Sequence, residues 1–338
     1  MSSSSSSTAA SLKSKTLPEG WSKGYSKSQK KIYYVHASTK HTQWHFPTAE
    51  DTARRGNKSK DNSTKRARSG GSSDDANKKQ KTGVSVAIIV PYRDLHVAQK
   101  RAAHLKQFIP HMHRFFGKAQ GGLRDYGIYI VEQSDDGRKF NRGKLLNIGF
   151  DVAKRAGHDV FIFHDVDLLP GQDLLESYTA FPTVPLHIAR VWGRYSNNPK
   201  YFGGVVSFSG KDYERINGYP NTFWGWGGED DEMQLRLEKC HIQWKWPEKG
   251  TLVDLEDMTL KEKLAFLREN KSWKCMVKWE ALEEHEKTWK TNGLANLDYE
   301  LLRKTNLDDT GKAVKLSVDV KLNEGHWAND KAGVDYLP

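Results

Sequence analysis

The chain has 338 residues, 37% of them hydrophobic, and a formal net charge of +11. Residues 1–82 hold 17 Lys and Arg against 6 Asp and Glu, whereas residues 83–338 hold 36 of each. The neutral C-terminal body argues against an extensive nucleic-acid interface there, because such interfaces need an excess of basic groups. Two cysteines exclude a disulfide framework and allow one disulfide, and no apolar run of about 18 residues predicts a membrane span.

The N-terminal part divides into three segments. Residues 1–16 are serine-rich, lack the apolar core of a secretory signal and are predicted to be disordered. Residues 17–47 hold short β-prone runs between polar turns, which fits three short strands. Residues 48–82 predict a basic disordered linker. Its two basic clusters, spanning Lys65–Lys81, fit a bipartite nuclear localisation signal or a solvated basic tether.

Residues 17–47 resemble a WW domain. Trp21, Tyr34 and Pro47 match the structural core of that family, and Ala37 stands where many members have a histidine that reads a ligand tyrosine. The resemblance implies a groove for a proline-rich peptide. A lysine-rich and serine-rich first turn makes a phospho-Ser-Pro or acidic proline-rich ligand plausible. The residues that match the groove are Tyr33, Thr42 and Trp44.

Residues 83–338 predict an α/β domain. Buried strands are expected at 84–90, 126–131 and 159–164, where β-branched and aromatic residues form continuous runs. One helix is expected after Asp94, acting as its N-cap, and another from about 140 to 155. Strands that alternate with helices indicate a sheet that is parallel at least in part.

Polar residues follow each predicted strand at its carboxyl end, which is where α/β sheets bind ligands. Asp165 and Asp167 can offer carboxylate oxygens to Mg²⁺ or Mn²⁺, and Arg93 and Arg142 suit phosphate oxygens. The pattern therefore predicts a site for a nucleotide sugar. The three polar stretches are 92–94, 132–133 and 165–167.

The stretch Trp224–Glu232 joins two tryptophans, three glycines and four acids. Glycines let the backbone approach a ligand, indoles stack on it, and carboxylates exchange protons with hydroxyl groups. The structural alternative is an aromatic turn before an acid-rich helix start, where the helix dipole tolerates acids. The combination favours a functional site, with Glu232 as the acid that serves as a helix-start charge.

Residues 84–300 resemble the β-1,4-galactosyltransferase family of metal-dependent, inverting glycosyltransferases, which have the GT-A fold. The resemblance rests on several motifs that occur in the family's order. The matching blocks are 91–93, 125–129, 140–142, 144–150, 165–167, 201–204, 216–221, 224–231 and 292–294.

The resemblance implies roles for the matching residues. Asp230 would be the general base, Glu229 would orient the acceptor, and Trp226 would close over the sugars. Tyr201 would leave little room for an N-acetyl group and so favour UDP-galactose as donor. Acceptor contacts would come from Asp231, Lys278 and Trp279. Donor contacts would come from Pro91, Tyr92, Arg93, Phe140, Arg142, Asp165, Val166, Tyr201 and Gly204.

The implied metal site departs from the family. Asp167 would be one ligand, but the family adds Met and His, or two His, where this chain has Leu252–Met258. Asp254 and Asp257 are the predicted replacements, with His241 as the alternative. An all-oxygen set is compatible with Mn²⁺ or Mg²⁺. The following segment, about 258–279, is longer than in the family, so the resemblance does not imply an acceptor.

The sequence therefore predicts a galactosyltransferase that uses UDP-galactose and Mn²⁺, acts on a glycan or glycoprotein, and is recruited by its WW domain. Two alternatives are a nuclear glycosyltransferase acting on modified nucleic acid and a catalytically dead WW adaptor. The family's disulfide cysteines and signal anchor are not found. The expected location is the cytoplasm or nucleus, with the Golgi as the family-based alternative.

Overall fold

A computed structural model of the chain describes residues 17–26, 31–37, 42–43, 47, 83–94, 99–195 and 198–321. The chain divides into two compact units, 1–78 and 79–338. The smaller unit is an antiparallel sheet of β1 (Trp21–Ser26), β2 (Lys31–His36) and β3 (Thr42–Gln43), in that order. This matches the predicted three short strands. Trp21 is buried, and its ring meets that of His36 edge-on at 5.0 Å.

The predicted groove of this unit lies outside the described residues, because Trp44 and the side chains of Tyr33 and Thr42 are not described. The two basic clusters between Lys65 and Lys81 also lie outside them.

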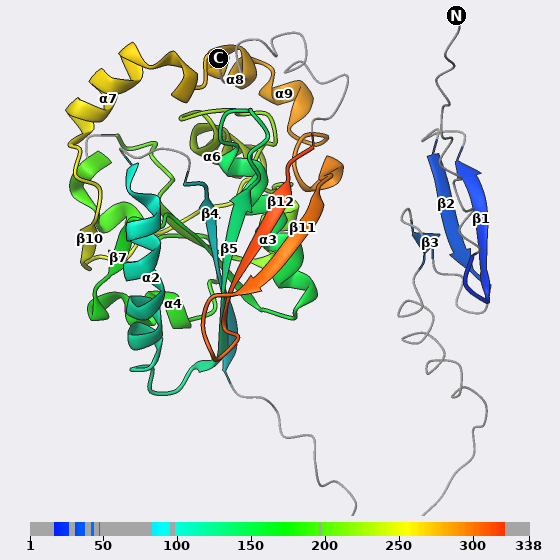
Figure 1. The fold of residues 1–338 in the computed structure, drawn as a ribbon, viewed down its shortest axis with the longest axis horizontal. Coiled ribbons are helices and arrows are strands. Elements are labelled where there is room, and N and C mark those ends of the chain that lie inside the picture. Colours follow the sequence, from blue (N-terminus) through cyan, green and yellow to red (C-terminus); the bar gives the residue numbers. More distant parts are fainter. Residues whose placement is uncertain are drawn as a thin grey trace, which may run out of the picture. The chain divides into compact units, whose positions relative to one another are not determined.

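The larger unit is built on a mixed seven-stranded sheet of order β11-β12-β5-β4-β6-β9-β8 (Figure 1). The four central strands, from β12 to β6, are parallel, and the outer ones pair antiparallel. The strands are β4 (Val84–Tyr92), β5 (Leu123–Gln133), β6 (Val160–His164), β8 (Leu186–His187), β9 (Val205–Ser209), β11 (Glu300–Asn306) and β12 (Ala313–Asp319). The three strands predicted from apolar runs are thus present, and two of them are longer than predicted.

Two hydrophobic cores cover the two faces of this sheet. Alternate residues of a strand point to opposite faces, and β4 follows that rule. Val86, Ile88 and Val90 pack in one core with α2 (Arg101–Phe116). Ala87 and Ile89 pack in the other with α3 (Arg142–Arg155).

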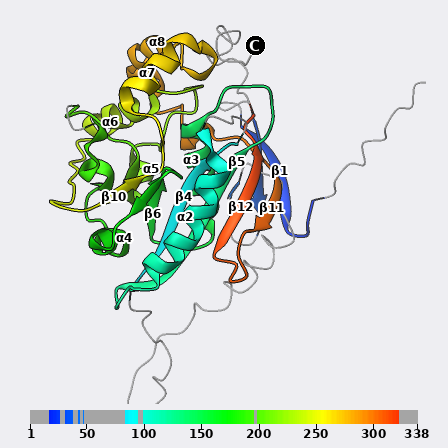
Figure 2. The same cartoon turned by 60° about the vertical axis from the view of Figure 1, so that its left-hand side comes forward.

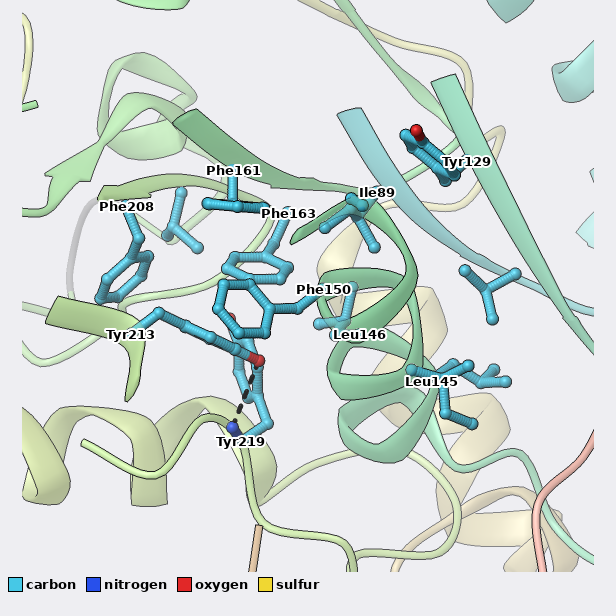
Figure 3. Close-up of a cluster of buried hydrophobic side chains, with 14 of the residues drawn as sticks. Ile89, Tyr129, Leu145, Leu146, Phe150, Phe161, Phe163, Phe208, Tyr213 and Tyr219 are labelled. Carbon is cyan, nitrogen blue, oxygen red and sulfur yellow. Dashed lines mark hydrogen bonds between the residues drawn. The ribbon is translucent and has the colours of Figure 1, made fainter. Parts of the chain in front are cut away.

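The core beneath α3 is rich in aromatic rings (Figure 3). Phe150 of α3 lies 4.6 Å from Phe161 and 4.5 Å from Tyr213, measured between ring centres. The Tyr213 hydroxyl donates to Asn147 Oδ1 at 2.6 Å. This core fixes α3 on the sheet, so the first residue of α3 is held at the sheet's edge.

Side-chain acceptors satisfy backbone donors near the starts of α2 and α3. α3 begins as predicted, and Asn141 caps it by accepting a hydrogen bond from the Lys144 backbone N–H at 3.0 Å. α2 begins at Arg101, and residues 95–98, where the helix predicted after Asp94 would begin, lie outside the described residues. Asp94 still accepts from the Ala102 N–H at 3.1 Å, so it satisfies a helix-start donor from a distance.

The remaining elements lie between or beyond the strands of this sheet in the chain. Figures 1 and 2 show α7 and α8, in yellow to orange, at the end of the sheet toward which β4 runs. These elements are β7 (Leu168–Pro170), α4 (Leu175–Thr179), η4 (Gly193–Tyr195), α5 (Gly210–Arg215), α6 (Glu229–Lys239), β10 (Leu252–Asp254), α7 (Leu260–Glu269), η5 (Lys271–Trp273), α8 (Lys278–Glu283) and α9 (His285–Thr288).

Candidate active site

A cavity of about 430 Å³ lies at the carboxyl ends of β4 and β6, between the start of α6 and helix α7. It brings together residues from widely separated segments. The sequence-predicted residues of the larger unit that do not line it are Gly204, Asp254, Asp257, Trp279 and the alternative ligand His241. Those that line it are Pro91, Tyr92, Arg93, Phe140, Arg142, Asp165, Val166, Asp167, Tyr201, Trp226, Glu229, Asp230, Asp231 and Lys278.

Arg142, the first residue of α3, joins three carboxylates from two elements. Its Nε and Nη2 donate to Asp165 Oδ1 at 3.0 and 2.9 Å. Its Nη1 donates to Asp230 Oδ1 at 2.9 Å and lies 3.6 Å from Glu229 Oε1. The guanidinium predicted to contact the donor thus also fixes the relative positions of the end of β6 and the start of α6.

Burial dominates the protonation of this cluster. It raises the pKa of Asp230 well above the usual value, although Arg142 opposes the rise, and the charge of Glu229 adds to it. Burial likewise raises the pKa of Glu229, whose Oε2 atom is buried without a hydrogen-bond partner. A carboxylate with a raised pKa holds a proton more readily, which is the property a general base needs.

Gly203 makes room for Asp230, and sequence reasoning missed this role. A Cβ atom at position 203 would lie 2.1 Å from Asp230 Oδ2 and 2.9 Å from the Tyr201 ring. Gly204 has a φ of +75°, and a Cβ there would lie 2.9 Å from the Tyr201 hydroxyl. The predicted donor residue Gly204 therefore acts from beneath Tyr201. Because Gly203 and Gly204 have no side chains, the Tyr201 phenol and the Asp230 carboxylate can lie close to the backbone at this point.

Trp226 belongs to a loop that is paired with the segment after α7. Its backbone N–H donates to Trp273 O at 2.7 Å, and its carbonyl accepts from Cys275 N at 3.1 Å. A Cβ at Gly225 would come within 2.7 Å of the Lys274 backbone, so glycine is needed for this approach. Trp226 is 37% exposed and lines the cavity. The two paired loop segments thus hold its backbone at the cavity wall.

The predicted acceptor residues separate into two groups. Lys278 and Asp231 line the cavity and form an ion pair at 2.6 Å. Trp279 does not line it and is 69% exposed, with Lys278 Nζ 5.0 Å from its ring centre. The structure therefore places Trp279 outside the cavity rather than on its wall.

A second carboxylate cluster adjoins the cavity. Oxygens of Asp167, Asp254 and Glu256 lie within 4.8 Å of one another. The predicted ligand Asp257 is not among them, since its exposed carboxylate pairs with Lys100 at 2.6 Å. Asp254 Oδ1 accepts a hydrogen bond from the Glu256 backbone N–H at 2.8 Å. In the local turn that this bond closes, the Glu256 side chain faces the cluster. Glu256 is thus a residue that sequence reasoning missed.

Basic side chains balance these three acids. Arg101 forms an ion pair with Asp167, and Arg194 lies 2.7 Å from Asp254. Burial would raise the pKa of Asp167, but Arg101 outweighs it and lowers the pKa to about 2. Three carboxylate oxygens at this spacing fit a hard divalent cation such as Mn²⁺ or Mg²⁺.

Other expectations are settled away from the cavity. Glu232 is no solvated helix-start charge, because it is buried and pairs with the buried Arg236 at 2.6 Å. The Arg236 guanidinium also donates to the carbonyls of Asn217, Gly218 and Asn292, so it anchors α6. Cys240 and Cys275 are both buried and are not joined in a disulfide, so the disulfide left open by the sequence is not formed.

Among the described residues, no helix has the length and apolar character needed to cross a membrane.

Three family models match the chain. Residues 17–47 match the WW domain, residues 47–179 the N-terminal region of glycosyl transferase group 7, and residues 184–260 a model described as the N-terminal domain of galactosyltransferase. The two galactosyltransferase-related models together cover more than half of the chain.

Curated relatives give the same result. The chain is 38% identical over 223 residues to β-1,4-galactosyltransferase 4 of Mus musculus, covering 64% of this chain and 59% of that protein. It is 34% identical over 220 residues to β-1,4-galactosyltransferase 3 of Homo sapiens, covering 64% and 51%. The chain therefore spans only a little over half the length of these relatives.

Solved structures match the fold. The catalytic domain of Drosophila β-1,4-galactosyltransferase 7, in complex with xylobiose, has a TM-score of 0.60 and 27% identity, covering 75% of this chain and 99% of that one. A variant of the same protein, in complex with manganese, UDP-Gal and xylobiose, has a TM-score of 0.59, 27% identity and the same coverage. With the cavity's residues and the family models, these matches establish that the chain belongs to the β-1,4-galactosyltransferase family, with a GT-A fold and an N-terminal WW domain.

Proposed function

We propose that this protein transfers galactose from UDP-galactose to a hydroxyl group of a glycan or glycoprotein, with inversion at the anomeric carbon. The observation that supports it most is the position of Asp230. This partly buried carboxylate, whose pKa is raised, lines the same cavity as Tyr92, Phe140 and Arg142, which are predicted to hold the donor.

In the proposed reaction Asp230 accepts the proton of the acceptor hydroxyl, and Glu229 orients the acceptor. The hydroxyl oxygen forms a bond to the anomeric carbon while the bond to the UDP oxygen breaks on the opposite face. UDP leaves with the electron pair of that bond. Arg142 keeps Asp230 in place through the 2.9 Å contact.

Asp167 and Asp254 are the predicted residues that would hold Mn²⁺, and they are close enough to share one ion. When bound, Mn²⁺ would offset the negative charge that develops on the departing diphosphate. The manganese and UDP-Gal in the solved Drosophila relative support this assignment of cofactor and donor.

Donor choice is assigned to Tyr201. Its ring lies against Tyr195, with 4.4 Å between ring centres, and both line the cavity. Gly203 and Gly204 hold it from beneath, where any Cβ would collide with it. A phenol fixed on both sides leaves little room for an N-acetyl group, which favours UDP-galactose over UDP-N-acetylgalactosamine.

The test is donor profiling of the full-length protein with Mn²⁺. Hydrolysis or transfer is measured with radiolabelled UDP-galactose and UDP-N-acetylgalactosamine, against glycan, glycoprotein and RNA fractions. We expect UDP-galactose to be used and label to appear on glycan or glycoprotein. Label on nucleic acid alone would refute the acceptor class. A protein that binds UDP yet neither hydrolyses nor transfers galactose would be an adaptor.

The WW domain is proposed to recruit a proline-rich partner or acceptor, because Trp21 and Pro47 are buried as a WW core requires. Titration with proline-rich peptides, phosphorylated at Ser-Pro or not, tests this. Absence of binding to either peptide would contradict the assignment.

Localisation in the nucleus or cytoplasm stays a prediction from the basic clusters between Lys65 and Lys81. A fluorescent fusion with both clusters replaced by glutamine tests the nuclear part. Unchanged nuclear signal in that variant would exclude the clusters as the import signal.

A further inference from the structure

Glu256 is the acid of the second cluster that pairs with two cations. Its carboxylate lies within 4.8 Å of an oxygen from Asp167 and from Asp254. One oxygen lies 2.8 Å from Arg194 Nη2, and both oxygens accept from Lys263 Nζ, at 3.0 and 3.1 Å. Its side chain is only 10% exposed, so water contributes little to its solvation.

The two cations on Glu256 differ in how firmly they are held. The Arg194 guanidinium is 7% exposed and also contacts Asp254 and the Met258 carbonyl, both at 2.7 Å. It therefore fixes the two carboxylates side by side. Lys263 has Glu256 as its ion-pair partner and carries its charge on a flexible four-carbon stem. Arg194 is therefore suited to keep its contacts with the two carboxylates when a cation binds, whereas Lys263 is suited to release Glu256.

Lys263 belongs to α7, which borders the cavity through Lys263, Phe266 and Leu267. Among the described residues, the Lys263–Glu256 pair is the ion pair that joins α7 to the rest of the protein. A change in the partner of Glu256 would therefore act directly on this wall of the cavity.

We propose that Glu256 is the third carboxylate ligand of the divalent cation held by Asp167 and Asp254, and that this cation competes with Lys263 for it. Binding of the cation then frees α7 from the cluster. The proposal rests on the proposed function in one respect, namely that this site takes a divalent cation. Manganese in a solved relative of the same family supports that point independently of the cluster's geometry.

The donor set implies a hard cation. All three ligands are carboxylates, and oxygen ligands suit Mg²⁺ and Mn²⁺ without favouring softer ions such as Zn²⁺. Arg194 acts as a positioning residue, since contacts that orient metal ligands affect metal affinity almost as strongly as the ligands do. We expect Mg²⁺ and Mn²⁺ both to bind.

The first test measures Mn²⁺ binding to the full-length protein by calorimetry and by electron paramagnetic resonance, without donor or acceptor. We expect Glu256→Gln to weaken binding by about ten-fold or more. Lys263→Met removes the competitor, and we expect tighter binding by about five-fold, the size of a weak ion pair. Asp257→Asn, in the same loop, is the matched control and leaves affinity unchanged.

The two variants are expected to change the Mn²⁺ affinity in opposite directions. Misfolding cannot explain both results, because a damaged protein would not bind Mn²⁺ more tightly. Thermal melts identify any variant that fails to fold. Wild-type affinity in Glu256→Gln, or unchanged or weaker binding in Lys263→Met, would overturn the proposal. A larger loss in Asp257→Asn than in Glu256→Gln would return the third ligand to Asp257.

The second test follows amide hydrogen exchange in α7. We expect Mn²⁺ to speed exchange in the wild type, whereas Lys263→Met exchanges fast without the ion. The outcomes distinguish failure of the ligand assignment from failure of the proposed transferase function. Galactose transfer with unaltered Mn²⁺ affinity in Glu256→Gln refutes only the ligand assignment. The predicted affinity changes without any use of UDP-galactose refute only the transferase.

Discussion

Two clusters of three acids lie next to each other at this cavity, and their charges are balanced differently. Asp165, Glu229 and Asp230 share the single guanidinium of Arg142. The second cluster has three basic partners for its three acids. Arg101 pairs with Asp167, Lys263 pairs with Glu256, and Arg194 pairs with both Asp254 and Glu256.

The difference separates two kinds of chemistry. Where one cation serves three acids that are partly or fully buried, burial prevails and raises the pKa of Asp230. Where Asp167 has its own Arg101, the ion pair prevails over burial and the pKa falls to about 2. The first cluster suits proton transfer, whereas the second, in which Asp167 keeps its charge, suits a cation.

The largest expected effect comes from Asp230→Asn, which removes the base and leaves the shape. We expect galactose transfer to fall by about 10²- to 10⁴-fold, with UDP affinity and Mn²⁺ affinity nearly unchanged. Transfer assays and calorimetry with UDP measure the two properties. A comparable loss of UDP binding would make Asp230 a donor or metal group and would erase the distinction between the clusters.

Arg142→Lys tests whether one guanidinium organises the first cluster. A single ammonium cannot contact Asp165 and Asp230 in the bidentate way of arginine, so we expect transfer to fall by about 10²-fold through misplacement of the base. Arg155→Lys, at an exposed position of the same helix, is the control. Equal activity in both variants would contradict the organising role.

Gly203→Ala tests the close approach of Asp230. The added Cβ would lie 2.1 Å from Asp230 Oδ2, so the carboxylate must move. We expect transfer to fall by about ten-fold or more, while Mn²⁺ affinity stays unchanged because the second cluster is untouched. Gly193→Ala is the control, since a Cβ there meets no atom within 4 Å. Full activity in Gly203→Ala would show that the space is not needed.

The sequence predicted the central strands well, because their apolar pattern is contained within short continuous segments of the chain. The run Val84–Tyr92 is apolar on both faces, so only a buried strand accommodates it. The helix start predicted after Asp94 falls on residues 95–98, outside the described residues, but Asp94 does accept a hydrogen bond from the Ala102 N–H of α2.

The first cluster was predictable from motifs, whereas the second was predictable only in part. Asp254, Glu256 and Asp257 are near-neighbours with the same chemistry, and a single turn decides which of them faces Asp167. The basic partners belong to no motif, because Arg101 and Lys263 meet their acids only through packing of α2 and α7. Pairing of charges across distant elements is a property of the fold and is not readable from spacing.

The smallest expected effect is a separation of two pH profiles, and it tests the comparison itself. Asp230 must be ionised to act as base, and its pKa is raised, so kcat/KM should fall with decreasing pH while an ordinary aspartate would still be ionised. Asp167 stays ionised far below that point, because its pKa is about 2. As the pH falls, we therefore expect Asp230 to lose its charge, and the enzyme its activity, at a higher pH than the one at which Asp167 is protonated. The kcat/KM profile measures the first pH, and the Asp167 carboxyl resonance measures the second. Arg142→Met should move the activity limb to still higher pH, because Arg142 lowers the pKa of Asp230. If the two limbs coincided in the wild type, both acids would belong to one titrating unit, and the two clusters would not divide proton transfer from cation binding.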